Sequence, residues 1–288
     1  MTNTRKVHLH FIFLVIVFHF LFPGNAKAKM KRAEKKNKVE FLFIEWRDKE
    51  NQLLLGHYEN KSKKIIDIKC SPETLTDAQL QTWLKGDKAI LLFHCMWGQQ
   101  SWFHKIKYLN TFDELFESST SNDVVVISFL WHAGGIHYKS NWERSFNKGK
   151  SLSGVLQRVN QYYAGNTSVL CHSMGSRFFE GALNDHSISP AFKEVILFSS
   201  DISSNTADPG FVSIMNSAKQ ISIFKHRKDK MLFFSSCIHG ENRIGRTGPM
   251  PEAGNMTVYD MTDHIHGFQN HAHVNRRWAK EQLKKLLQ

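Results

Sequence analysis

Residues 167–183 read Thr-Ser-Val-Leu-Cys-His-Ser-Met-Gly-Ser-Arg-Phe-Phe-Glu-Gly-Ala-Leu. The first five form a short run of β-branched and apolar residues, typical of a buried strand. The last eight have the composition of a helix, and only His172-Ser173-Met174-Gly175 separates the two. A strand that passes directly into a helix is the repeating unit of α/β proteins. This stretch therefore predicts one strand–turn–helix unit of an α/β sheet.

Apolar runs of similar length recur on both sides of this unit. The further predicted strands are Val39–Trp46, Leu53–Tyr58, Lys64–Ile68, Lys88–His94, Asp123–Leu130, Lys193–Ser199, Gln220–His226 and Met256–Asp260. Residues 89–93, 124–127 and 195–198 are continuously apolar, which indicates strands covered on both faces of a mostly parallel sheet. The first three predicted strands have no helix between them. We expect them to pair as an antiparallel meander at one edge of the sheet.

Helical spacing of apolar residues fills the gaps between the later strands. A helix is expected from Ser71, with Ser71 as N-cap and Pro72 at the first helical position. The other predicted helices cover residues 101–118, 141–164, 174–184, 208–217 and 273–288. No linker interrupts residues 39–260, so we predict one α/β domain over residues 39–288. It has a mostly parallel central sheet, antiparallel N-terminal edge strands and helices on both faces.

The chain has 288 residues and a formal net charge of +12, which raises the question of a nucleic-acid partner. Residues 1–38 hold nine bases and one acid, so only +4 belongs to residues 39–288. A nucleic-acid interface needs many basic residues spread over a folded face. The confined charge argues against nucleic-acid binding.

The N-terminal charge has a separate explanation. Arg5 and Lys6 precede an uncharged apolar run, Val7–Phe22, which is followed by Pro23-Gly24 and the small-residue pattern Ala26-Lys27-Ala28. This layout predicts a signal peptide over residues 1–28 and export to the periplasm or the medium. The run is shorter than the about 20 residues that span a bilayer, and an inner-membrane anchor over residues 7–22 is the alternative. Lys29–Lys38 is then a basic tail, either a linker or a contact with an anionic membrane surface.

The turn after the strand at 167–171 resembles the nucleophile elbow Gly-x-Ser-x-Gly, with Cys171 at the first glycine position. A serine on such a turn presents its hydroxyl to substrate, and the helix behind it stabilises negative charge. Ser173 is therefore the candidate nucleophile, and the backbone N–H of Met174 is a candidate oxyanion donor. The alternative is that Ser173 only caps the helix.

A second oxyanion donor is expected where the strand at 88–94 ends. The sequence there is His94-Cys95-Met96-Trp97-Gly98, and the donor is the backbone N–H of Cys95 or of Met96. The alternative is that His94 is a hydrogen-bonded histidine at the end of the strand and has no part in catalysis.

An acid and a base follow in the order Ser, Asp, His, which is the chain order of a hydrolase triad. Asp229 comes just past the strand at 220–226, and His271 lies in a histidine-rich segment after the final strand. In this interpretation His271 takes the proton of Ser173, and Asp229 holds the imidazole. Asp201 is the next candidate acid, and Asp229 as a solvated surface acid is a further alternative.

Four histidines of the last segment compete for the role of base. They are His264, His266, His271 and His273. With Asp260 or Asp263 they also provide zinc-type ligands, but their spacing fits no zinc motif. We therefore expect no metal and no cofactor.

Five features together resemble a bacterial α/β-hydrolase family of unassigned function, over roughly residues 88–275. They are Asp123–Trp131, the elbow 172–175, Val195–Ser200 with Asp201 after it, the strand that leads to Asp229, and Arg243-Ile244-Gly245. The resemblance implies serine-hydrolase chemistry. The family's terminal His-x-Tyr matches His271-Ala272-His273, with histidine for tyrosine, which favours His271 as the base.

The same resemblance shows two departures, because Cys171 and Cys95 stand where the family has glycine. In the α/β-hydrolase strand order these cysteines end neighbouring strands, so a Cys95–Cys171 disulfide is a hypothesis, although parallel neighbours seldom meet the geometry it needs. Residues 132–150 and 235–255 are expected to be loops at the pocket. Their bases are interpreted as solvated, with an anionic substrate group as the alternative; they are Lys139, Arg144, Arg243 and Arg246.

The sequence thus predicts an exported serine hydrolase that cleaves a carboxylic ester through an acyl-enzyme on Ser173. A thioester or an amide is a second choice, and the expected substrate is a small molecule or a lipid-like ester. The alternative is a catalytically silent α/β-hydrolase fold that serves as a binding or scaffold protein of the cell envelope. The two replaced glycines motivate this alternative.

Overall fold

A computed structural model of the chain describes residues 39–47, 50–59, 63–95, 102–116, 124–133, 137–184, 192–251, 254–265, 271 and 276–287. The predicted signal peptide and basic tail lie outside these residues. Within them, one nine-stranded sheet has the order β3-β2-β1-β5-β4-β6-β7-β8-β9. The strands are β1 Glu40–Arg47, β2 Gln52–Glu59, β3 Lys63–Cys70, β4 Lys88–Phe93, β5 Val124–Leu130, β6 Thr167–His172, β7 Phe192–Phe198, β8 Ala218–Lys225 and β9 Met256–Asp260.

The sheet is mostly parallel, as predicted. From β1 across to β9 every neighbouring pair is parallel, and β2 runs antiparallel to both β1 and β3. The predicted antiparallel meander at the N-terminal edge is confirmed. Since the parallel strands share one direction, the ends of β4, β6 and β8 lie at the same edge of the sheet.

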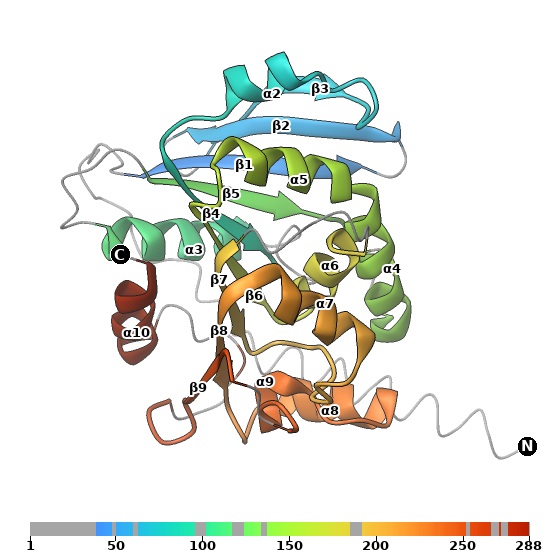
Figure 1. The fold of residues 1–288 in the computed structure, drawn as a ribbon, viewed down its shortest axis with the longest axis vertical. Helices are drawn as coiled ribbons and strands as arrows, with labels where there is room; N and C mark the ends of the chain where they lie inside the picture. The colour runs from blue at the N-terminus through green and yellow to red at the C-terminus, as the bar shows by residue number, and fades with distance from the viewer. Residues whose placement is uncertain are drawn as a thin grey trace, which may run out of the picture.

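Helices cover both faces of the sheet (Figure 1). They are α2 Asp77–Trp83, α3 Trp102–Leu115, α4 Tyr138–Ser151, α5 Ser153–Tyr162, α6 Gly175–Ala182, α7 Pro209–Ser217, α8 Lys230–His239, α9 Ile244–Thr247 and α10 Arg277–Leu287. Side chains of α3 and α10 join one buried cluster. Side chains of α2, α5, α6 and α7 join the other, on the opposite face. The two faces are therefore packed separately, as alternate strand residues require.

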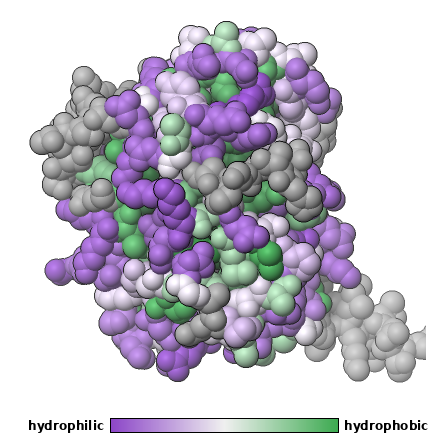
Figure 2. Space-filling model, in the orientation of Figure 1, coloured by the Kyte–Doolittle hydropathy of each residue, from purple (hydrophilic) through white to green (hydrophobic). Residues whose placement is uncertain are grey.

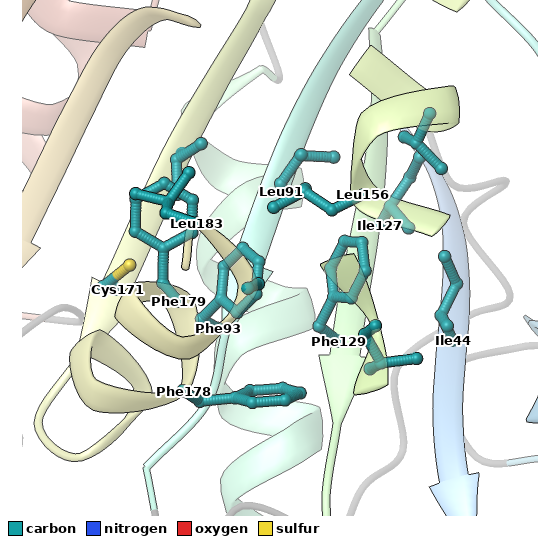
Figure 3. Packing of buried hydrophobic residues seen from close by; sticks show 14 of the residues in the cluster. Ile44, Leu91, Phe93, Ile127, Phe129, Leu156, Cys171, Phe178, Phe179 and Leu183 are labelled. Atoms are coloured by element: carbon teal, nitrogen blue, oxygen red, sulfur yellow. The ribbon is translucent and has the colours of Figure 1, made fainter. Parts of the chain in front are cut away.

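The core beneath the elbow is aromatic (Figure 3). Phe93 of β4 stacks on Phe129 of β5 at a centroid distance of 4.7 Å. The rings of Phe178 and Phe179 from α6 approach Phe93 to 5.5 and 5.0 Å. This packing fixes α6 against β4, the strand beside β6.

Two predicted helices are corrected. The helix expected from Ser71 begins at Asp77, because Thr76 and Gln79 form a reciprocal capping box and residues 71–74 form a turn. The single helix expected over residues 141–164 is two helices, α4 and α5. At Leu152 the backbone leaves the helical region (φ −105°, ψ 2°), and its N–H donates to the Gly149 carbonyl three residues back.

Residues 132–150 and 235–255 were expected to be loops, and this is wrong for much of both. Helix α4 fills most of the first, and α9 with the second half of α8 lies in the second. Arg243 is not a solvated base, since its side chain is fully buried in ion pairs with Asp201 and Glu241. All four cysteines, Cys70, Cys95, Cys171 and Cys237, are free thiols, so the hypothesised Cys95–Cys171 disulfide is not formed.

The face of the molecule seen in Figure 2 is predominantly polar. Hydrophilic side chains cover most of the face seen in Figure 2, and the hydrophobic ones lie in small separate areas. Among the helices of the described ranges, none has the length and apolar character needed to cross a membrane.

Candidate active site

Ser173 occupies the turn between β6 and α6 in a strained backbone conformation. Its φ is +55°, in the left-handed region that non-glycine residues seldom adopt. The Ser173 N–H donates to the Phe198 carbonyl at 3.0 Å, and the Ser173 carbonyl accepts the Asp201 N–H at 3.2 Å. These two bonds to the end of β7 hold the turn in place. Such strain in a non-glycine residue is characteristic of functional sites.

The glycine two residues later is required by close contact. A Cβ on Gly175 would lie 2.1 Å from the Phe93 carbonyl oxygen at the end of β4. A larger residue would push α6 away from the sheet. The small residue after the serine thus permits the sharp passage from strand to helix that exposes Ser173 at the sheet edge.

His271 contacts both Ser173 and Asp229. Its Nε2 lies 2.7 Å from Ser173 Oγ, and its Nδ1 lies 2.8 Å from Asp229 Oδ2. An ionised carboxylate only accepts, so Nδ1 carries the hydrogen and Nε2 accepts the serine hydroxyl. The structure brings the three predicted residues together in the order that proton transfer from the serine needs.

Asp229 is completely buried and is the N-cap of α8. Its Oδ1 accepts the Leu232 N–H at 3.0 Å, and its Oδ2 faces His271. Both carboxylate oxygens therefore have defined partners, which fixes the carboxylate plane. The alternative of a solvated surface acid is wrong.

The comparison with protein families agrees with this fold. The family model described as "Alpha/beta hydrolase of unknown function (DUF900)" matches residues 73–280. The chain belongs to this family. The match includes every strand from β4 to β9 and the site residues Ser173, Asp229 and His271, and it excludes β1, β2 and β3. No curated protein matches the chain significantly.

The structure of this family member describes two of the three candidate oxyanion donors, Met174 and Cys95. Met174 is the N-cap of α6. Its carbonyl accepts the N–H groups of Arg177 and Phe178, which are the first hydrogen bonds of the helix. Its own N–H has no acceptor in the part of the chain that the structure describes. Cys95 lies just past the end of β4 and is buried, whereas Met96 lies outside the described residues.

His94 is also buried, at the end of β4. Its backbone carbonyl accepts the indole N–H of Trp131 at 3.2 Å. This bond ties the ends of β4 and β5 together.

Asp201, the alternative acid, has other partners. It is completely buried, and its carboxylate accepts from the hydroxyls of Tyr138 and of Ser235, the latter at 2.5 Å. Arg243 Nε lies 3.4 Å from the same carboxylate. Burial raises the pKa of Asp201 to about 6, although Arg243 and Ser235 oppose the shift. Asp201 therefore stands beside the Ser173–His271–Asp229 group, bonded to the elbow only through its backbone.

The basicity of His271 follows from its surroundings. Burial lowers its pKa, but the charge and hydrogen bond of Asp229 together with the charge of Asp201 outweigh this, and the net pKa is raised above its ordinary value of 6.5. An imidazole with this pKa accepts a proton readily near neutral pH.

The other histidines of the C-terminal segment are placed differently or not placed. His264 is exposed and stacks on Trp278 with ring centroids 4.5 Å apart. His266 and His273 lie outside the described residues. Within the described ranges, no group of three or more His, Cys, Asp or Glu side chains is arranged to hold a metal ion.

Proposed function

We propose that this chain is an exported serine hydrolase that cleaves carboxylic esters through an acyl-enzyme on Ser173. The observation that carries the proposal is the double contact of His271, with Ser173 Oγ on one side and Asp229 on the other. A serine that only capped a helix would need no buried imidazole and carboxylate behind it. Export rests on the sequence of residues 1–28 alone.

The geometry supports a two-step reaction. Ser173 Oγ attacks the ester carbonyl while His271 Nε2 takes its proton, and Asp229 stabilises the imidazolium that results. The Met174 N–H donates to the oxyanion, with the N–H of Cys95 or Met96 as the second donor. His271 then protonates the leaving alcohol, and a water molecule activated by His271 hydrolyses the acyl-enzyme. The expected substrate is a small or lipid-like ester, and Lys29–Lys38 would hold the enzyme near an anionic membrane.

The test is the Ser173→Ala variant of the purified chain. We expect loss of p-nitrophenyl ester hydrolysis and of labelling by a fluorophosphonate probe, because both need the serine oxygen. The matched control is Ser151→Ala, an exposed serine at the end of α4, which should keep both activities. Retention of both activities in Ser173→Ala would refute the assignment.

The competing function is a silent hydrolase fold that binds a ligand or scaffolds other proteins. Cys171 and Cys95, which stand where the family that the sequence resembles has glycine, motivate it. It predicts that the wild-type protein folds normally but reacts with no fluorophosphonate probe.

A further inference from the structure

Two buried histidines outside the Ser173–His271–Asp229 group contact the segment that carries His271. The first is His172, the residue before the nucleophile. Its Nε2 lies 2.8 Å from the backbone carbonyl oxygen of His271, and the two imidazole rings lie 5.3 Å apart. A carbonyl only accepts, so His172 Nε2 carries the hydrogen and donates it. His172 therefore holds the main chain of the residue whose side chain contacts Ser173.

The second is His226, which lies three residues before Asp229. The Lys228 N–H donates to His226 Nδ1 at 3.1 Å, which leaves the ring hydrogen on Nε2. This Nε2 lies 2.9 Å from the Ile265 carbonyl oxygen. The Asp229 N–H in turn donates to the His226 carbonyl at 3.0 Å. The turn that positions Asp229 thus also holds the beginning of the segment that leads to His271.

The contacts of His172 and His226 are alike, because in each a histidine Nε2 faces a backbone carbonyl of the segment that includes His271. Ser173 and Asp229 each follow a parallel strand of the sheet, whereas His271 follows β9 by eleven residues and belongs to no strand. Its position depends on bonds from its own segment to the sheet. His172 and His226 supply two such bonds. His172 directly precedes the nucleophile Ser173, and His226 lies three residues before the acid Asp229. His172 and His226 are 3% and 1% exposed, so water has little access to their ring N–H groups.

We propose that His172 and His226 are positioning residues, which set the His271 imidazole between Ser173 and Asp229 by holding the carbonyls of residues 271 and 265. The inference rests on the proposed function and deepens it. Each positioning histidine donates its Nε2 hydrogen to the backbone carbonyl that it faces. Their effect is on the orientation of the base, and they do not touch the reacting atoms.

The test compares two substitutions of His172. Glutamine keeps an N–H donor near the position of Nε2, and phenylalanine keeps a ring but removes the donor. We expect His172→Phe to lower kcat for p-nitrophenyl esters about 10- to 100-fold with KM nearly unchanged, because a misplaced base slows chemistry without weakening binding. His172→Gln should recover most of kcat. His57→Gln, an exposed histidine of β2, is the control and should behave as wild type.

Fluorophosphonate labelling rates should follow the same pattern, and His226→Phe should resemble His172→Phe. Wild-type kcat in both phenylalanine variants would overturn the proposal. So would a folded His172→Gln protein that is as slow as His172→Phe, since a purely structural role for the ring gives that result.

A spectroscopic measurement separates this inference from the proposed function. In protein labelled with ¹⁵N-histidine, the proton between His271 Nδ1 and Asp229 should give a downfield NMR signal in the wild type and in His172→Gln. It should be lost or broadened in His172→Phe. If the wild type hydrolyses no ester but shows this pattern, the proposed function fails and the positioning inference stands. An unchanged signal in His172→Phe would overturn the inference whatever the activity.

Discussion

At the scale of single residues, His271 connects groups from three distant parts of the chain. Its contacts join residues 98 and 42 positions apart in the sequence. The chain order of serine, acid and histidine predicted these three residues. Asp201 remained the next candidate acid after Asp229, because both follow apolar strands of similar length. The structure separates them, since Arg243, Ser235 and Tyr138 surround the Asp201 carboxylate.

Asp229→Asn should lower kcat by about 10⁴-fold, because an amide at this place no longer holds the Nδ1–H tautomer of His271. Asp201→Asn should retain far more activity, since its carboxylate makes no hydrogen bond to His271. Steady-state kinetics of both variants with a p-nitrophenyl ester decide between the two acids. A larger loss in Asp201→Asn than in Asp229→Asn, with both proteins folded, would reverse the assignment.

The pH dependence follows from the raised pKa of His271. The base must be neutral to accept the proton of Ser173, so kcat/KM should rise with pH, reach half its maximum above pH 6.5, and fall as the pH drops. Asp201 contributes to the raised pKa, so Asp201→Asn should move the acidic limb of the profile to lower pH. A pH–rate profile of wild type and variant measures both effects. An acidic limb below pH 6 in the wild type would contradict the expectation.

At the scale of elements, strands were predicted more accurately than helices. The buried parallel strands are short apolar runs, and this pattern is visible locally. The sequence does not predict helix α8, because its apolar residues do not all lie on the buried face. Phe233 and Ile238 are 47% and 46% exposed, whereas Ser235 is buried against Asp201. A hydrogen-bonded serine on the buried side cannot be recognised without its partner.

Helices α4 and α6 pack with their backbones in close contact. A Cβ on Gly149 would lie 2.0 Å from the Phe178 carbonyl oxygen, and one on Gly181 would lie 2.0 Å from the Phe146 carbonyl oxygen. Two glycines therefore allow α4 to lie directly on the helix that follows the nucleophile. The sequence contains both glycines, but their pairing is a property of the packed helices.

Gly149→Ala should lower the free energy of unfolding by about 1–3 kcal/mol, because the methyl group meets backbone that cannot move without separating the helices. Gly154→Ala in α5 is the matched control, since a Cβ there has no atom within 4 Å. It should leave stability unchanged or raise it by up to about 1 kcal/mol. Urea denaturation of both variants gives the comparison. Equal stability of the two would show that α4 and α6 adapt freely.

At the scale of the whole molecule, the sheet separates two buried clusters. The amphipathic C-terminal helix predicted from Ala279, Leu283, Leu286 and Leu287 is confirmed as α10, and it closes one cluster together with α3. The other cluster contains Cys171, at the end of β6 beneath the elbow. The fold is completed by packing rather than by covalent bonds between cysteines.

Thiol reactivity should reflect this arrangement. Cys237 is exposed and Cys70 is half-buried, whereas Cys95 and Cys171 are buried, and burial raises the pKa of the Cys171 thiol. In native protein an alkylating reagent should modify Cys237 first and Cys171 last, since the thiolate is the reactive form. In denaturant without reductant all four should react, as mass spectrometry would show. Fewer than four modified cysteines under those conditions would indicate a disulfide.

The sequence by itself determined the α/β class, the mostly parallel sheet with its antiparallel edge, and Ser173 as the residue of the sharp turn. Each of these depends on residues adjacent along the chain, whose apolar pattern and turn composition act locally. Only the tertiary structure decided that His271 meets Asp229, that Asp201 meets Arg243, and that His172 holds the carbonyl of residue 271. These pairs are made when strand ends converge at one edge of the sheet, and a one-dimensional pattern does not contain the distances between them.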